Sequence, residues 1–285
     1  MNNDVIARLI KQFGESEAEE IVRLARRVQR LEGEWLRRIE EFYRALAKRT
    51  ARKLLERGVP PSADDIDFED VFTEFWFDVQ IEAFKSVESM TPIPKRMAKK
   101  KRTLKDLIRE RNAWRKGKLR PKVPKGYIKD LKSEYLDKIH KYWRKHSDDF
   151  LQGEVYNQEQ AYKKLTEDLN LGESRARTII RTETTRYYNE VRKEFYDQVP
   201  DVTHYLFVSI RDHRTTDWCR TRDGLVYKKT SKFKWEIPPP CHWNCRSEIL
   251  PLDPDNPNHK RLIDDTNQSR DNNSPTPLPR GFKKR

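Results

Sequence analysis

Apolar residues recur at steps of three and four along much of the chain, which is the spacing of amphipathic helices. The first stripe follows Ser16 and Glu19, a pair that predicts a capping box, and runs to Gly58. A second stripe, rich in Phe and Trp with acidic residues between them, follows Pro60. The short connection predicts an antiparallel helical hairpin in which these aromatic side chains form the core.

The second half of the chain changes its hydrophobic period. Three more helices are predicted over residues 127–146, 154–169 and 174–198. After them, residues 202–210 are rich in β-branched and aromatic side chains, an Asp-Gly turn follows, and return strands are predicted over 225–227 and 246–250. The predicted fold class is α+β, with a long helical N-terminal arm or hairpin and a small C-terminal domain of short antiparallel strands.

Charge divides the chain further. Of its 285 residues 37% are charged and 35% hydrophobic, and the formal net charge is +14, which favours an anionic partner. Residues 95–125 hold fifteen Lys and Arg against two Asp and Glu, so they carry nearly the whole excess. We therefore predict four parts, which are a helical arm (1–94), a basic connector (95–125), an α+β domain (126–252) and an extended or disordered tail (253–285).

The basic connector predicts contact with phosphate groups. The alternative is that this segment is only a solvated linker. Contact with phosphate is favoured because one side of the segment is apolar, with Leu104, Leu107, Ile108 and Trp114. We expect sequence-independent binding of duplex DNA, since no base-reading module is recognisable, although an acidic protein surface would engage the same residues. The expected nucleic-acid-binding residues are Lys95, Arg96, Lys99, Lys100, Lys101, Arg102, Lys105, Arg109, Arg115 and Lys116.

Nothing in the sequence predicts membrane insertion. No run approaches the roughly 18 consecutive apolar residues of a spanning helix. The polar N-terminus lacks the apolar core of a signal peptide. We therefore expect synthesis in a cytosol and no contact with a membrane during assembly.

Three cysteines and two histidines form the most specific cluster in the sequence. Cys219, Cys241, His242 and Cys245 supply the ligand types of a closed Cys₃His zinc site, but simultaneous ligation by the neighbours Cys241 and His242 is awkward. A second ligand set, His213, Cys219, His242 and Cys245, leaves Cys241 free. Zn²⁺ is thus the candidate cofactor. The metal-free alternative is thiols packed as small apolar side chains, or oxidised as a Cys219–Cys245 pair.

The same Cys and His side chains also fit an enzyme, either a metal-dependent nuclease or a toxin-like effector with a Cys/His nucleophile. A nuclease that uses a hard cation needs clustered carboxylates, and this region offers only scattered Asp212, Asp217 and Asp223. We therefore predict no enzymatic activity. Arg181 and Glu183 are predicted to form a buried ion pair that ties their helix to the loops that carry these Cys and His residues.

Three blocks carry a family resemblance. They are RTETTRYYNEVRKEFYD from Arg181, DHRTTDWC from Asp212 and PPPCHWNCRSEILPL from Pro238, and together they resemble the phage head morphogenesis (Mu F-like) minor capsid protein family over residues 175–252. Ser247 follows Arg246, so a four-thiol site is excluded. The positions that match the family motif are Arg181, Thr182, Glu183, Asn189, Asp212, Arg214, Thr215, Cys219, Gly224, Pro239, His242, Asn244, Cys245 and Arg246.

The resemblance implies a low-copy minor head protein that associates with the portal inside the procapsid and virion. Such a protein would contact packaged DNA and aid head assembly or DNA ejection. The expected partners are the portal protein, duplex DNA and a scaffold or major capsid protein. The expected location is the virion interior, after assembly in the host cytoplasm. A portal-docking surface is the alternative role for the aromatic stripe of the predicted hairpin.

Overall fold

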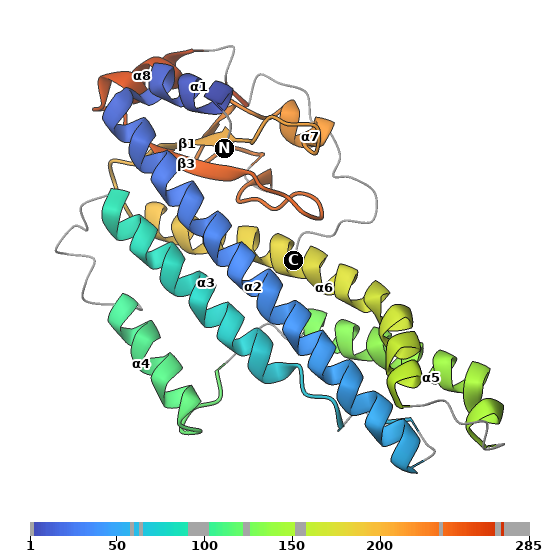
Figure 1. The fold of residues 1–285 in the computed structure, drawn as a ribbon. Helices are drawn as coiled ribbons and strands as arrows, with labels where there is room; N and C mark the ends of the chain where they lie inside the picture. The colour runs from blue at the N-terminus through green and yellow to red at the C-terminus, as the bar shows by residue number, and fades with distance from the viewer. Residues whose placement is uncertain are drawn as a thin grey trace. The chain divides into compact units, whose positions relative to one another are not determined.

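The fold is that of a computed structural model, which describes residues 3–57, 60–62, 65–90, 103–121, 126–151, 158–233, 236–265 and 269–270 (Figure 1). Its helices are α1 (Asn3–Phe13), α2 (Glu15–Arg57), α3 (Glu69–Met90), α4 (Leu104–Arg115), α5 (Gly126–Leu151), α6 (Gln158–Tyr196), α7 (Asp217–Arg220) and α8 (Pro257–Asp264). Its strands are β1 (His204–Val208), β2 (Val226–Lys228) and β3 (Glu248–Leu252). The predicted α+β class is confirmed. None of the helices within these ranges combines the length and apolar character needed to cross a membrane.

The chain divides into two compact units, each built from segments that are distant in sequence. Unit 1 comprises Met1–Glu32, Phe77–Leu119 and Arg181–Arg285, and unit 2 comprises Gly33–Trp76 and Arg120–Ile180. Helices α2, α3 and α6 therefore contribute residues to both. The four ranges drawn from composition stay a prediction of how the chain is organised.

The sheet of unit 1 has three antiparallel strands in the order β2-β1-β3. In the central strand, Tyr205 lies opposite Tyr227 of β2 and Pro251 of β3. This confirms the three strands predicted from the change of period. Because successive side chains point to opposite faces, Tyr205 and Phe207 lie on one face and Leu206 and Val208 on the other, and all four are buried.

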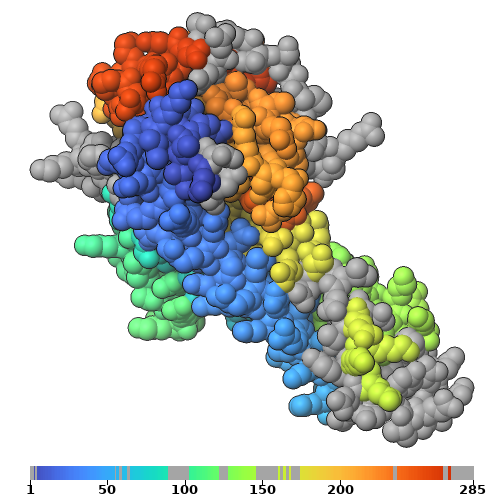
Figure 2. Space-filling view, turned by 45° about the horizontal axis from the view of Figure 1, so that its top comes forward, coloured from blue at the N-terminus to red at the C-terminus, as the bar shows by residue number. Residues whose placement is uncertain are grey.

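Both faces of this sheet are covered. The first packs on the end of α6 and on the motif loops, with a core of Val87, Tyr196, Val199, Val202, Tyr205, Phe207, Trp218, Cys219, Tyr227, Phe233, Ile237, Cys241, Cys245 and Ile249. The second packs on α1, the start of α2, and α8, with a core of Val5, Leu9, Phe13, Ala18, Ile21, Val22, Leu206, Val208, Val226, Leu250, Leu252 and Leu262. Figure 2 shows the blue N-terminal segment beside the orange and red C-terminal segments. The candidate cysteines thus lie in the first core.

Helices α1 and α8 of unit 1 were not among the predicted helices. Helix α1 presents its apolar positions to the sheet and ends at Gly14, whose φ of 84° suits glycine. Helix α8 starts at Asn256, whose side chain accepts a hydrogen bond from the Asn258 N–H, with Pro257 in its first turn. The prediction of an extended or disordered tail from residue 253 is therefore wrong for α8, because these capping residues start a helix. Residues 271–285 lie outside the described residues.

The predicted aromatic hairpin forms the core of unit 2. Ring centroids of Trp35 and Phe75 lie 5.4 Å apart, and those of Phe42 and Phe68 lie 5.1 Å apart. Tyr135 of α5 joins them, at 6.0 Å from the Phe68 ring. These contacts within unit 2 confirm that the aromatic stripe is core.

Helix α6 corrects a second prediction. The sequence predicts separate helices over 154–169 and 174–198, whereas the structure has one continuous helix from Gln158 to Tyr196. Gly172 lies within it, and a glycine inside a helix costs only about 1 kcal/mol relative to alanine. The long apolar side that continues into residues 176–188 offsets such a cost.

Candidate metal centre and adjoining cavity

Helix α7 places the first candidate ligand. Thr216 caps this short helix, because its hydroxyl accepts a hydrogen bond from the Cys219 N–H at 3.4 Å. Trp218 and Cys219 then point into the first core and are 6% and 1% exposed. The cap therefore sets the direction in which the Cys219 thiol faces.

The loop from residue 238 to residue 246 places the other two ligands, and helix α6 holds that loop. The Asn244 N–H donates to the Thr182 hydroxyl at 3.0 Å, and the Cys245 carbonyl accepts from the Thr185 hydroxyl at 2.6 Å. Asn244 has a φ of 57°, in the left-handed region that Asn tolerates. Farther along, Asn189 donates to the Ser247 carbonyl at 3.1 Å. Thr182, Asn189 and Asn244 therefore position the loop, as family-motif residues with a structural role should.

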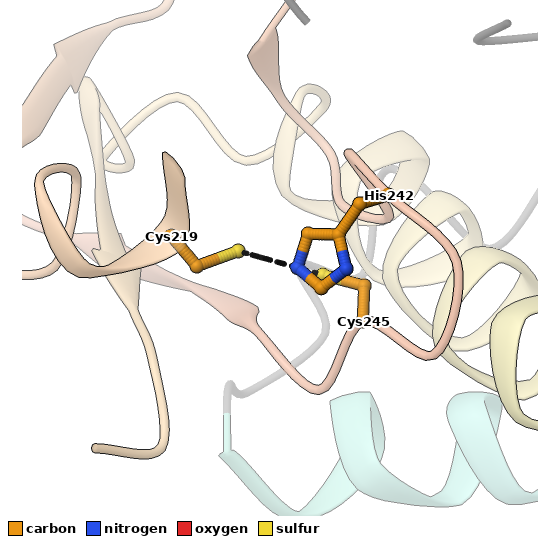
Figure 3. A group of neighbouring side chains, drawn as sticks. All are labelled: Cys219, His242 and Cys245. Atoms are coloured by element: carbon orange, nitrogen blue, oxygen red, sulfur yellow. Dashed lines mark hydrogen bonds between the residues drawn. The ribbon is translucent and has the colours of Figure 1, made fainter. Parts of the chain in front are cut away.

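The three side chains converge as a buried group (Figure 3). The Cys219 Sγ lies 3.0 Å from the His242 Nε2 and 3.8 Å from the Cys245 Sγ. All three ligand atoms lie within 4.8 Å of one another. The His242 Nδ1 lies 2.8 Å from the Trp243 carbonyl, to which it can donate, so that Nε2 is left to accept or to bind a metal. The group could therefore hold a metal ion.

The separations fit zinc closely for the thiols. In a tetrahedral site with Zn–S near 2.3 Å and Zn–N near 2.0 Å, two sulfurs lie about 3.8 Å apart and a sulfur and a nitrogen about 3.5 Å apart. The thiol pair has that spacing, and the Cys219 to His242 distance is shorter by about 0.5 Å. A small rotation of the imidazole would open it. All three cysteines are free thiols.

Two predicted ligands lie elsewhere. His213 is exposed in the loop after β1 and does not belong to the group. Cys241 is buried, but its thiol donates to the Glu236 carbonyl at 3.1 Å. Within the described residues, the group therefore offers three ligands, so neither predicted four-residue set is assembled.

The pKa values of the Cys219 and Cys245 thiols are shifted in opposite directions. Burial raises the pKa of Cys245, yet hydrogen bonds from Cys219 and His242 outweigh burial and hold this pKa well below its usual range. The hydrogen bond to Cys245, together with burial, raises the pKa of Cys219. Burial lowers the pKa of His242, but the hydrogen bond and charge interaction with Cys245 and the hydrogen bond to the Trp243 carbonyl together raise this pKa by more, so its net direction is upward. The arrangement favours a Cys245 thiolate, and a thiolate is the form that binds metal.

The predicted ion pair of Arg181 with Glu183 is not formed. Arg181 instead pairs with Glu32 of α2 at 3.2 Å, and Glu183 pairs with Arg186 at 3.1 Å. Both partners of the second pair are buried and lie one helical turn apart. Residues two apart on a helix point in different directions, which explains why the predicted pair is absent.

Beside the metal group lies a cavity of about 760 Å³ in unit 1. Asp212 and Arg246 lie in its wall and are joined by two hydrogen bonds of 2.7 and 2.6 Å. Several motif residues meet there with Gln29 and Glu32 of α2, which were not predicted as site residues. The cavity is lined by Gln29, Glu32, Arg181, Ile210, Asp212, Arg214, Thr216, His242, Trp243, Asn244 and Arg246.

Gly224, the remaining motif glycine, occupies a turn with a φ of 88° and donates its N–H to the Phe207 carbonyl at 2.8 Å. The adjacent Asp223 carboxylate has no exposed surface and accepts from the Ser209 N–H at 2.8 Å. Arg8 of α1 also pairs with this carboxylate. The turn therefore joins β1 to the N-terminal helix.

Four of the predicted nucleic-acid-binding residues lie on or just after α4. Lys105, Arg109, Arg115 and Lys116 are exposed. The others, Lys95, Arg96, Lys99, Lys100, Lys101 and Arg102, lie outside the described residues. Helix α4 begins with a capping box at Thr103.

The fold and the site together define a small α+β domain whose loops are fastened to a long helix around a buried Cys/His group. Residues 150–250 match the model of the family described as Phage Mu protein F like protein, which confirms the family resemblance of these blocks. The match supports a role in phage head morphogenesis. No curated protein and no solved structure matches the chain.

Proposed function

We propose that this chain is a minor head protein of a tailed phage, bound at the portal inside the procapsid and virion. The family match over residues 150–250 carries this proposal. The protein is assembled in the host cytoplasm and stays in the virion interior, where a scaffold or major capsid protein is a further partner. It contacts packaged duplex DNA without reading its sequence, aids head assembly or DNA ejection, and has no enzymatic activity.

Helix α4 supports the DNA contact. Its inner side is fixed within unit 1, because Leu107 is fully buried, Trp114 lies 5.9 Å from the Phe77 ring, and Arg111 pairs with Asp78 at 2.6 Å. Its outer side carries the exposed residues Lys105 and Arg109, with Lys116 at its end. A fixed helix with a basic outer side can neutralise backbone phosphates without base contacts.

The DNA test is a salt titration of binding to a duplex. A variant with Lys105, Arg109 and Lys116 replaced by Ala should bind more weakly, with a log–log salt slope flatter by about 2 to 3, since each phosphate contact contributes about 0.9. Replacement of Lys99, Lys100, Lys101 and Arg102 by Ala should flatten the slope by several units. Duplexes of unrelated sequence should behave alike.

The matched control removes the same charge elsewhere. Lys129, Lys141 and Arg144 are exposed on α5, and their replacement by Ala should leave the slope within about 1 of the parent value. Equal slopes in all variants, or an equal loss in the control, would refute DNA binding by the basic connector.

Portal association is tested on particles. Mass spectrometry of purified virions should detect a few copies of the chain per particle, and cross-linking should join it to the portal. Complete absence from virions would contradict the proposal.

The rival function, a metal-dependent nuclease, predicts DNA cleavage by purified protein. We expect none, because no carboxylate of the described residues belongs to the Cys/His group.

We propose further that Cys219, His242 and Cys245 bind Zn²⁺ in a structural role. The bound ion would join α7, which carries Cys219, to the loop before β3, which carries His242 and Cys245. Its contribution would be folding free energy, since ligands from separate loops are held together only in the folded state.

A further inference from the structure

The cavity beside the metal group has the features of a ligand site. Six of its lining residues, Arg181, Asp212, Arg214, His242, Asn244 and Arg246, belong to the motif that carries the family resemblance. Residues needed only for packing would be spread through the core. Their convergence around one space of about 760 Å³, the size of a small-molecule site, indicates that they hold something.

Two guanidinium groups in the cavity have capacity to bind. The Arg181 Nε donates to Glu32, and among the described residues its two terminal nitrogens make no hydrogen bond. The Arg214 side chain is 60% exposed and meets Asp212 only as an ion pair at 3.7 Å. Arg246 differs, because both its terminal nitrogens are held by Asp212. Arg181 and Arg214 are therefore the groups that can receive a ligand.

The charge and shape of the cavity indicate which class of ligand it can bind. The three arginines outnumber the two acids, Glu32 and Asp212, by one positive charge, which suits an anion of low charge. Guanidinium forks from two separate elements match the several oxygens of a phosphate group. The Trp243 indole and the Ile210 side chain add apolar surface on which a flat ring can pack.

We propose that this cavity binds a nucleotide, with its phosphate held by Arg181 and Arg214 and its base against Trp243. Asn244 also lines this cavity. Its side-chain amide makes no hydrogen bond among the described residues, so it can contact the base or sugar. The ligand is either a free mononucleotide or one unit of a single strand. This site is separate from the basic side of α4 and does not depend on it.

Calorimetric titration of the full chain tests the site with thymidine monophosphate, thymidine and inorganic phosphate. The monophosphate should bind at least about tenfold more tightly than thymidine, because hydrogen bonds to a charged group are the main attraction. Arg181→Gln and Arg214→Gln should each weaken monophosphate binding by about tenfold or more. Circular dichroism and thermal unfolding establish that these variants are folded.

The matched control is Arg220→Gln. Arg220 has a side chain 51% exposed, lies in unit 1 and is not part of the cavity lining, so its loss should change affinity by less than about twofold. The α4 variant should likewise retain monophosphate binding even where duplex binding is lost. Failure of the nucleotide site and failure of DNA contact by α4 are thereby distinguished.

A strand and a free nucleotide are separated by pentathymidylate with and without a 5′-phosphate. Equal binding of both supports recognition of a phosphodiester within a strand, and binding of the phosphorylated form alone supports recognition of a terminal or free monophosphate. Absence of monophosphate binding, equal affinity for thymidine, or equal affinity for a diglutamate peptide would overturn the proposal.

Discussion

Glu236 is a carboxylate with no exposed surface, and its side chain accepts hydrogen bonds from three buried groups. Arg222 donates at 3.1 and 3.0 Å, Arg270 at 2.8 and 2.7 Å, and the Tyr227 hydroxyl at 2.7 Å. Burial raises the pKa of Glu236, but the hydrogen bonds from Arg270, Arg222 and Tyr227 outweigh burial and lower it. One carboxylate therefore supports two buried cations.

We predict that Glu236→Gln lowers the free energy of unfolding by about 3 kcal/mol, because the two guanidinium groups lose the negative charge that they share. Urea unfolding followed by tryptophan fluorescence measures this change. Asp264→Asn is the control, since Asp264 and its partner Lys260 have side chains 59% and 62% exposed, and its cost should stay below about 0.5 kcal/mol. Equal small losses in both variants would contradict the prediction.

We also predict that Cys219, His242 and Cys245 bind zinc. Elemental analysis of protein purified without chelator should find about one equivalent of zinc. Cys219→Ser, His242→Ala and Cys245→Ser should each abolish it, because each removes one of three converging ligand atoms. Zinc absent from freshly purified, reduced protein would favour the metal-free packing of these thiols.

Two variants test the ligand set. Cys241→Ser and His213→Ala should both retain zinc, because the Cys241 thiol is directed to the Glu236 carbonyl and His213 is exposed outside the group. Loss of zinc in His213→Ala would restore the four-ligand set that the sequence spacing predicts. Loss in Cys241→Ser alone would instead support the Cys₃His alternative.

At the scale of elements, the Asp212–Arg246 pair joins the loop after β1 to the start of the β3 segment. The hydrogen bond from Arg246 is the main cause that holds the pKa of Asp212 below its usual 3.8, and the Arg214 N–H adds to it. A carboxyl group whose folded pKa is depressed stabilises the fold above its unfolded pKa. That stability is lost as the pH falls toward the folded pKa.

We therefore predict that Asp212→Asn destabilises the protein at pH 6 and that the difference from the parent shrinks when both are measured at about pH 3. Urea unfolding at the two pH values measures it. Asp217→Asn is the control, because the Asp217 side chain is 99% exposed, and it should leave stability nearly unchanged at pH 6. A difference for Asp212→Asn that is as large at pH 3 as at pH 6 would exclude the ion pair as its source.

Elements with long periodic stripes could be predicted from the sequence, and elements with short ones could not. Helix α2, the aromatic hairpin and the three strands follow from periods of 3.6 and 2. Helix α1 carries Val5, Leu9 and Phe13 at helical spacing, but over only 11 residues, and its stability comes from the sheet face that it covers. The start of α8 at Asn256-Pro257 is a capping signal that can be found in the sequence.

The candidate site was partly predictable for a similar reason. Cys219, His242 and Cys245 could be selected by residue type, but the fourth ligand depended on where the loop with His213 lies. The cavity is also lined by Gln29 and Glu32 of α2, and Glu32 precedes its partner Arg181 by 149 residues. Local sequence holds no signal for such a long-range contact.

At the scale of the whole molecule, unit 1 depends on both ends of the described chain. Helix α1 and the start of α2 cover one face of the sheet, and α8 completes that cover. The Asn258 side chain donates to the Phe13 carbonyl at 3.1 Å, and His259 lies 3.0 Å from the Glu17 carboxylate. The N-terminal segment is thus part of the core that holds the motif loops, although it precedes the family match at residues 150–250.

We predict that Leu9→Ala lowers the free energy of unfolding by about 3 kcal/mol, because Leu9 is 0% exposed and its loss leaves a cavity against the sheet. Ile10→Ala is the matched control, since the neighbouring Ile10 is 40% exposed and should cost less than about 1 kcal/mol. Hydrogen exchange should also become faster at the amides of β1 in Leu9→Ala, because the strand and α1 share one core. Faster exchange confined to α1, with β1 unchanged, would show instead that this helix opens on its own.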